Sequence, residues 1–212
     1  GQPTAAVSSQ KNNPNLKPEF SKEIELGTQL DFFKERVNLD FTWYHKISTN
    51  LLAPISTPPS SGYANYYTNY GKISNKGIEI DLNIVPIRLR DFSWSIHGAF
   101  TKNKSVVEEL TTGVNRLALN GVLANTINPY LEPGLPFGYL RGTKVIRDSL
   151  GNYLINPATG GMIAAPDEGF IGDPNPDFKL GITNTFTYKG FELSVLFDMT
   201  KGGDIYSETV TT

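Results

Sequence analysis

Residues 178–199 read FKLGITNTFTYKGFELSVLFDM, and this stretch decides the fold class. Large apolar side chains alternate with small or polar ones on both sides of Lys189-Gly190. Because successive side chains of a strand point to opposite faces, each half forms a strand with one apolar and one polar face. The two-residue break suits a tight turn, in which glycine adopts a positive φ at little cost. The stretch therefore predicts an antiparallel hairpin.

The same period-two alternation recurs in two earlier pairs of stretches. The six predicted strands cover residues 24–32 and 37–43, 78–84 and 92–100, and 178–188 and 191–199. All eight charged residues within these stretches fall on the polar face. The pattern predicts an all-β, antiparallel chain of about six strands in three hairpins.

Connection lengths separate a membrane barrel from a soluble sandwich, which also segregates its charges. Connections within pairs are short (33–36, 85–91 and 189–190), whereas those between pairs, about 50–69 and 103–177, are long. Short turns at one end and long loops at the other are typical of outer-membrane barrels. A Lys or Arg facing lipid near the midplane costs about 2–4 kcal/mol, and the apolar faces carry none. We therefore expect a transmembrane β-barrel segment with long surface loops.

Aromatic residues gather near both ends of the predicted strands, as they do at the two membrane–water boundaries of a barrel. At the short-turn end they are Phe32, Phe33, Phe92, Trp94, Tyr188 and Phe191, and towards the other end Trp43, Tyr44, Phe100, Phe178 and Phe197. The alternative is that they form the core of a β-sandwich.

The composition of the chain argues against two classes of protein, those that bind nucleic acid and those that cross a membrane with a helix. The chain has 212 residues, a net charge of −2 and no cysteine. It has no basic cluster that would indicate nucleic-acid binding and no apolar run long enough for a transmembrane helix. The start of the sequence lacks a secretion signal, so we expect an internal piece or mature fragment of a longer outer-membrane protein.

Five short motifs, taken together, resemble one family. They are NPNLKPE at 13–19, NYGKISNKGIE at 69–79, GDPNPDF at 172–178, NTFTYKGFELS at 184–194 and GGDIY at 202–206. The set is similar to that of SusC/RagA-type TonB-dependent outer-membrane transporters, which often have Trp where Pro18 stands. The resemblance leaves the long connection 105–170 outside it.

This resemblance implies a larger barrel of roughly 22 strands closed by a plug. Residues 1–212 would form part of a single barrel domain in the cell outer membrane, with the plug and the remaining strands outside this chain. The implied function is TonB-dependent import of an oligosaccharide or glycan, or of a peptide. The implied partners are a SusD-like surface lipoprotein, TonB (through an N-terminal region absent here), outer-membrane lipid and the substrate, with no nucleic acid and no cofactor. The alternatives are a secreted β-sandwich that binds glycan and a structural or secretion-linked barrel of the same family.

Two groups of residues are candidates for binding. The acids of the polar face would make the lumen wall negative, and we expect them to hold basic groups of the plug; they are Glu25, Asp31, Asp40, Glu79, Asp81, Glu192 and Asp198. Four tyrosines crowd the first long loop: Tyr63, Tyr66, Tyr67 and Tyr70. Their rings could stack on sugars or contact the lid protein, or could simply pack the loop and form an aromatic belt.

Other candidate chemistry has a plainer interpretation. Asp173, Asn175 and Asp177 have the spacing of a calcium loop but lack the glycine and distal glutamate that follow in an EF-hand, so a capped strand entry is favoured. His45 and His97 have no partner at ligand spacing, and we expect polar lumen or rim positions for both. We therefore expect no metal site, no catalytic residues and no enzymatic activity.

Overall fold

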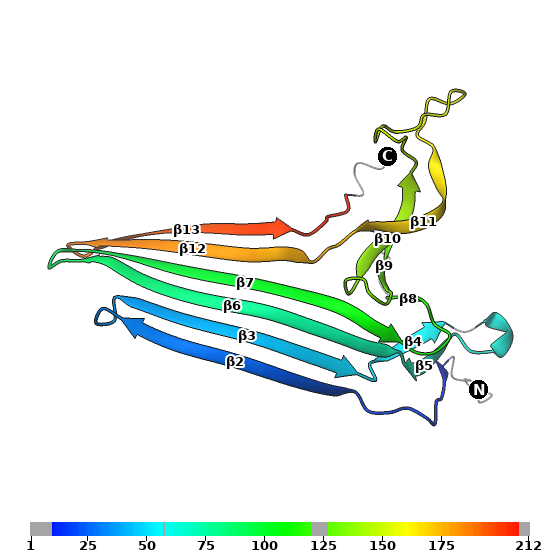
Figure 1. Cartoon of the computed structure of the whole chain (residues 1–212), viewed down its shortest axis with the longest axis horizontal. Helices are drawn as coiled ribbons and strands as arrows, with labels where there is room; N and C mark the ends of the chain where they lie inside the picture. Colours follow the sequence, from blue (N-terminus) through cyan, green and yellow to red (C-terminus); the bar gives the residue numbers. More distant parts are fainter. Residues whose placement is uncertain (1–9, 57, 120–126, 208–212) are drawn as a thin grey trace, which may run out of the picture.

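The computed structural model describes residues 10–56, 58–119 and 127–207, and its regular secondary structure is β-strand apart from one short 3-10 turn (Figure 1). The elements are β1 (Gln10–Lys11), β2 (Phe20–Phe32), β3 (Val37–Thr49), β4 (Leu52–Ser56), the 3-10 turn η1 (Pro59–Ser61), β5 (Asn65–Asn69), β6 (Gly71–Arg88), β7 (Phe92–Leu110), β8 (Leu117–Ala118), β9 (Ile127–Leu131), β10 (Tyr139–Val145), β11 (Ala164–Gly172), β12 (Pro176–Tyr188) and β13 (Phe191–Gly202). Within the described residues, no helix has the length and apolar character needed to cross a membrane.

The main element is a six-stranded antiparallel sheet in the order β13-β12-β7-β6-β3-β2. The three predicted hairpins are β2–β3, β6–β7 and β12–β13, so the predicted strands and their pairing are confirmed. Pairing of β7 with β12 joins the third hairpin to the second, although the whole of β8–β11 separates them in the sequence.

The strands run further than the alternation predicts. β6 and β7 contain 18 and 19 residues, and both extend at the end that carries the long connections. At about 3.3 Å per residue, each is roughly 60 Å long, whereas a tilted membrane strand needs about 9–11 residues. The long-connection end of the sheet therefore projects beyond the thickness of a bilayer.

The short turns have the backbone conformation that their residues favour. Lys189 and Gly190 have φ values of 45° and 86°, as in a two-residue hairpin turn with both central residues in the left-handed region. The connection predicted at 85–91 is shorter than expected, since β6 continues to Arg88. A register shift between Ile84 and Ile87 carries the strand past Pro86, which cannot donate a ladder hydrogen bond.

The two long connections are themselves folded. The first contains the β4–β5 hairpin, with β1 paired in parallel to β5. The second contains a four-stranded sheet in the order β11-β10-β9-β8, which lies to one side of the long sheet in Figure 1. The largest fully buried side chains among the described residues are at this end: Val107, Leu131 and Tyr139.

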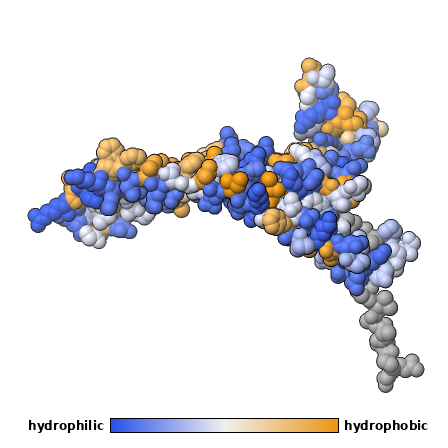
Figure 2. Space-filling model, turned by 60° about the horizontal axis from the view of Figure 1, so that its bottom comes forward, coloured by the Kyte–Doolittle hydropathy of each residue, from blue (hydrophilic) through white to orange (hydrophobic). Residues whose placement is uncertain are grey.

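The apolar face of the long sheet has no second layer over it within the described residues. Leu26 and Phe197 remain 65% and 64% exposed on this face. Figure 2 shows apolar side chains along the surface of the elongated sheet. This arrangement excludes the β-sandwich alternative for the described part, because a sandwich would enclose that face.

Candidate functional site

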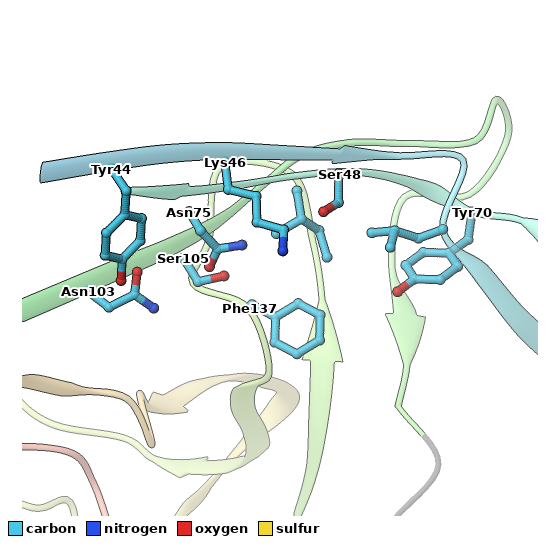
Figure 3. Close-up of a pocket in the computed structure, with 10 residues that line it drawn as sticks. Tyr44, Lys46, Ser48, Tyr70, Asn75, Asn103, Ser105 and Phe137 are labelled. Carbon is cyan, nitrogen blue, oxygen red and sulfur yellow. The ribbon is translucent and has the colours of Figure 1, made fainter. Parts of the chain in front are cut away.

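A cavity of about 490 Å³ lies on the polar face of the long sheet, at the end that carries the long connections (Figure 3). Polar groups come from three adjacent strands, and apolar groups come from β6 and the neighbouring loops. The lining residues are Tyr44, Lys46, Ser48, Leu51, Tyr70, Ile73, Asn75, Asn103, Ser105 and Phe137.

Strand register brings the polar lining together. Tyr44, Lys46 and Ser48 alternate along β3 and so share the face that carries Asp40. Lys46 lies opposite Asn75 of β6, and Asn75 lies opposite Ser105 of β7. The side chains of Tyr44, Lys46 and Asn75 point into the cavity (Figure 3).

Gly77 makes room for Tyr44. The two residues are opposite each other on β6 and β3, and a Cβ at position 77 would collide with the Tyr44 ring. The close approach that a strand glycine indicates is therefore observed, with a tyrosine as the bulky group. Glycine at this position allows the Tyr44 hydroxyl to reach the cavity.

Phe137 reaches the cavity because its segment occupies the free edge of β7. The pairing of β12 with β7 extends only to Lys179 and Thr101. Beyond that point the amide of Phe137 donates to the Ser105 carbonyl at 3.2 Å, and the amide of Val107 donates to the loop at Leu135 at 3.1 Å. The second long connection is thereby held against the upper part of the sheet.

A small hydrophobic core fixes this arrangement. Tyr70, Val107, Leu117 and Leu131 pack together, with Phe137 against them. The backbone of Tyr70 donates to Leu51 at 2.7 Å and accepts from Thr111 at 2.9 Å. Burial raises the pKa of the Tyr70 hydroxyl, and the nearby Glu19 carboxylate raises it further. Tyr70 therefore remains neutral and available as a hydrogen-bonding group.

Arg116, Glu132 and Tyr139 form a polar network in the second long connection, next to this hydrophobic core. The Nε of Arg116 donates to Glu132 Oε2 at 2.7 Å, and the Tyr139 hydroxyl donates to the same oxygen. These hydrogen bonds, that from Arg116 first, hold the pKa of Glu132 below its ordinary value. Burial raises the pKa of Tyr139, and its bond to Glu132 acts in the same direction. The network links the beginning of β8 to the end of β9 and the start of β10.

The lining suits non-covalent recognition of a polar solute. Asn75, Asn103 and the hydroxyl groups both donate and accept hydrogen bonds, while Phe137 offers an apolar ring. Within the described ranges, Lys46 has no ion pair or hydrogen-bond partner, so its ammonium group is available to a solute. No cluster of three or more potential metal ligands occurs in the part of the chain that the structure describes.

The four candidate tyrosines do not share one site. Tyr70 lines the cavity, Tyr66 lines a second hollow of about 410 Å³ beside Asn13, and Tyr67 lines a third beside Leu16. Tyr66 and Tyr67 are neighbours on β5 and so point to opposite faces. Tyr63 follows η1 and lines none of these three hollows. The binding role assigned to all four tyrosines stays a prediction.

The seven acids lie on the polar face, as their strand positions predict. Asp40 is directly opposite Asp81, and like charges in that position destabilise a sheet unless another group balances them. His97 lies on the same face with its Nε2 2.6 Å from Asp81. The acids form a negatively charged surface on the polar face, between the cavity and the short turns. Their expected role of holding basic groups of the plug stays a prediction.

The remaining candidates occupy structural positions. Asp173 accepts hydrogen bonds from the backbone and side chain of Asn175, and the Asp173 amide donates to Asp204. This is the capped strand entry that the sequence favours. His45 bonds to Ser74 at 3.0 Å at the rim of the apolar face.

Sequence reasoning identified Tyr70 but missed the other polar lining groups, above all Lys46, Asn75 and Asn103. A signal for them exists, because they continue the polar face of β3, β6 and β7 at period two beyond the last apolar residue. The prediction ended each strand where the apolar alternation ended, although the strand pairing continues.

Comparison with known proteins agrees with this geometry. Residues 2–158 match the model of the family described as "TonB dependent receptor-like, beta-barrel". The chain belongs to this TonB-dependent receptor family. Its long sheet is a segment of an antiparallel transmembrane β-barrel. In such a barrel the apolar face of the wall is turned towards lipid and the polar face towards the lumen. The match also covers much of the connection that the motif resemblance left out.

Curated relatives carry receptor names. "TonB-dependent receptor P3" of Formosa agariphila is 30% identical over 218 residues, which cover 93% of this chain and 22% of the relative. "TonB-dependent receptor SusC" of Bacteroides thetaiotaomicron is 24% identical over 204 residues, which cover 86% of this chain and 19% of the relative. The chain thus spans about a fifth of the length of these relatives.

Solved structures share the fold. The structure of the RagAB peptide transporter superposes with a TM-score of 0.69 at 20% identity, over 88% of this chain and 21% of that one. The RagAB peptide importer in its "open-open" state gives a TM-score of 0.68 at 20% identity, over 90% and 21%. At this identity the likeness establishes the barrel architecture alone.

Proposed function

We propose that the protein containing this segment imports a large nutrient across the outer membrane, as a SusC-like barrel energised by TonB. The observation that carries the proposal is a wall with two different faces. One face is apolar and uncovered over six contiguous strands, and the other holds a polar cavity at its long-connection end. Such a wall separates lipid from an aqueous path, and the cavity offers a solute its first contact on that path.

The proposed substrate is an oligosaccharide, with a peptide as the alternative. The amides of Asn75 and Asn103 and the hydroxyls of Tyr44 and Ser105 can bond a solute that presents hydroxyl or amide groups throughout. Phe137 supplies an aromatic ring on which a sugar ring or an apolar side chain can pack. These groups support both classes, and a direct uptake assay distinguishes them.

The proposed lid is a SusD-like surface lipoprotein. The β8–β11 sheet and the β4–β5 hairpin lie at the same end of the long sheet as the cavity (Figure 1). Folded elements around the entrance of a barrel present a surface on which a second protein can dock without blocking the lumen.

The acidic wall is proposed to hold basic groups of the plug. Asp40 and Asp81 are the most informative pair, because each faces the other across β3 and β6. Replacement of both with Asn removes two charges with little change in shape. Weaker plug retention is the expected result, and unchanged plug retention and transport would reject this role.

Uptake by cells that carry the full-length receptor tests the proposal. Deletion of the gene should abolish growth on the imported oligosaccharide or peptide, and unchanged uptake of every candidate nutrient would favour a structural or secretion-linked barrel. The variant Asn75→Ala/Asn103→Ala should weaken substrate affinity by about tenfold, since two hydrogen bonds are worth about 0.5–1.5 kcal/mol each. Asn38→Ala/Asn83→Ala is the matched control on the same face, away from the cavity. Equal affinity of both double variants would remove the cavity from the substrate path.

A further inference from the structure

Two motifs of the sequence, GDPNPDF at 172–178 and GGDIY at 202–206, meet where β12 begins and β13 ends. Two reciprocal hydrogen bonds join them: the Asp173 amide donates to Asp204 Oδ2 at 2.7 Å, and the Asp204 amide donates to the Asp173 carbonyl at 2.7 Å. Gly172 permits this contact, because a Cβ at that position would lie 2.8 Å from the Cβ of Asp204. The two motifs therefore form one interlocked unit.

This unit orients the side chain of Asn175. The Asp173 carboxylate accepts hydrogen bonds from the backbone amide of Asn175 at 2.9 Å and from its Nδ2 at 2.7 Å. Pro174 and Pro176 restrict the backbone on both sides, because a proline fixes its own φ and confines the residue before it to extended conformations. The backbone and the side chain of Asn175 are thus held in one orientation, although the residue is exposed.

The side-chain amide of Asn175 contacts the loop that carries Phe137 into the cavity. Its Nδ2 donates to the Phe137 carbonyl at 3.0 Å, across 38 positions of sequence. An asparagine amide has two hydrogens, and the bonds to Phe137 and Asp173 use both of them. Asn175 has no side-chain donor left for a solute and does not line the cavity. Its effect on the cavity therefore acts through Phe137.

Phe137 lies in a turn whose geometry this bond fixes. The Tyr139 amide donates to the Pro136 carbonyl at 3.3 Å and Gly138 has a φ of 72°, as in a type II turn with Phe137 and Gly138 at its centre. The orientation of the central peptide distinguishes type II from type I, and the Phe137 carbonyl belongs to that peptide. The Phe137 amide is bonded to Ser105 of β7 at 3.2 Å. The loop is thus held from β7 and from the start of β12, with the Phe137 ring in the cavity (Figure 3).

We infer that Asn175 is a positioning residue for the substrate: it holds the flat ring of Phe137 in the cavity and thereby favours solutes that present the apolar face of a pyranose ring. A side chain that is already ordered costs less entropy when a solute packs on it, and an aromatic face is a large apolar surface of fixed shape. The inference rests on the proposed function, because it assigns the Phe137 ring to the imported solute. A role in capping the strand alone would stabilise β12 without any effect on selectivity.

Fluorine NMR of the full-length receptor in nanodiscs, with para-fluorophenylalanine at position 137 alone, tests the positioning directly. The variant is Asn175→Ala, and Asn152→Ala is the matched control, because it removes a similar bond in the distal loop, from Asn152 Nδ2 to Asp148 at 3.0 Å. The wild type and the control should give one narrow resonance that a water-soluble paramagnetic agent broadens little. The resonance of Asn175→Ala should be broader and more accessible to the agent. The same spectrum for all three proteins would overturn the inference.

Binding measurements test the consequence for the solute. The probes are linear hexasaccharides of glucose, mannose, galactose and glucuronate, with a glycine hexapeptide as the probe that has no ring. Asn175→Ala should weaken binding of the preferred hexasaccharide about fivefold, the fold-change that corresponds to one hydrogen bond, and leave the affinity for the hexapeptide unchanged. Equal losses for both kinds of probe would overturn the selectivity, as would a wild type that binds no hexasaccharide.

A double-mutant cycle with Phe137 separates positioning from a general structural effect. Phe137→Leu keeps an apolar side chain for the hydrophobic core but removes the flat ring. In this background Asn175→Ala should cause no further loss of hexasaccharide binding, because its effect passes through the ring. Additive losses would show that Asn175 acts independently of Phe137 and would overturn the inference. Gene-dependent import with additive losses counts against Asn175 alone, whereas a changed fluorine spectrum without any import counts against the proposed function alone.

Discussion

The inner and outer parts of β6 and β7 belong to the same two strands, but they differ in which side chains point outward and which point towards the lumen. In the inner part, residues 78–88 and 92–100, apolar side chains point outward and polar ones inward. In the outer part, residues 71–77 and 101–110, the outward positions become Lys76, Lys102 and Lys104. Buried apolar residues, such as Val107, now lie on the lumen side beneath a loop.

The difference shows that strand pairing and side-chain pattern have separate causes. Backbone hydrogen bonds hold β6 to β7 over nearly the whole length of both strands. The pattern changes because the surrounding medium changes from lipid to water, and in water an apolar residue must be covered by the protein itself. The outer part therefore carries a small hydrophobic core of the kind found in water-soluble proteins, whereas the inner part is a single membrane-facing sheet.

The largest expected effect is on that hydrophobic core. Leu131→Ala should destabilise the outer part by about 2–5 kcal/mol, because Leu131 is 0% exposed and its removal leaves a cavity. Hydrogen exchange at the amides of Val107 and Gly134, which pair the loop to β7, measures the loss. Leu26→Ala in the inner part should cost less, since lipid chains fill the space and no cavity remains. Equal costs at both positions would contradict the division into two parts.

A lysine introduced at two outward positions of β2, one in the inner part and one near the outer end of the strand, tests where the membrane boundary lies. Leu26 and Phe20 share the outward face of β2 and are 65% and 64% exposed in this chain. Leu26→Lys should cost about 2–4 kcal/mol of barrel stability because it lies in the inner part, whereas Phe20→Lys lies beyond Lys22, outside the apolar band, and should cost almost nothing. Denaturant titration of the full-length barrel folding into lipid vesicles gives both values. A similar cost at both positions would refute the assigned membrane boundary.

A substitution at Gly77 tests the link between the wall and the cavity. Gly77→Ala should cost about 1–3 kcal/mol through overpacking, and it should displace the Tyr44 ring from the cavity. Gly181→Ala is the control on the same face, where the nearest atom to a new Cβ is 3.9 Å away. Substrate affinity should fall in the first variant and stay unchanged in the second. An undisturbed Tyr44 in the structure of the Gly77 variant would show that the glycine is not required there.

Acidification below pH 4.5 should loosen the contacts of Glu132 in the outer part. The folded pKa of Glu132 lies below its ordinary value of 4.5, because Arg116 and then Tyr139 donate hydrogen bonds to its carboxylate. Its contribution to stability is therefore complete above pH 4.5 and is lost as the pH falls through the lowered folded value. Hydrogen exchange around β8 and β9 should accelerate over that interval, and Glu132→Gln should remove the pH dependence. Acceleration of the same size in Glu132→Gln would assign it to another group.

The sequence predicts the inner part well and the outer part poorly. Alternation identifies all six long strands, because lipid on one side and water on the other impose a strict period of two. At Lys102 and Lys104 the apolar alternation ends, so the predicted strand stops although β7 continues to Leu110. The β8–β11 sheet has short strands of irregular pattern, and its core depends on contacts between distant residues. The cavity was missed for the same reason, since its polar lining lies beyond the last apolar position.

Direct measurement of which face meets lipid tests the central claim. This chain has no cysteine, so single cysteines can be placed at Leu82 and Asp81, adjacent positions on opposite faces of β6, in a full-length receptor free of other cysteines. A fluorophore at position 82 should be quenched by lipids brominated in their acyl chains and protected from a water-soluble quencher. A fluorophore at position 81 should show the reverse. Quenching of both positions by the same agent would contradict the account of the sheet as a wall between lipid and lumen.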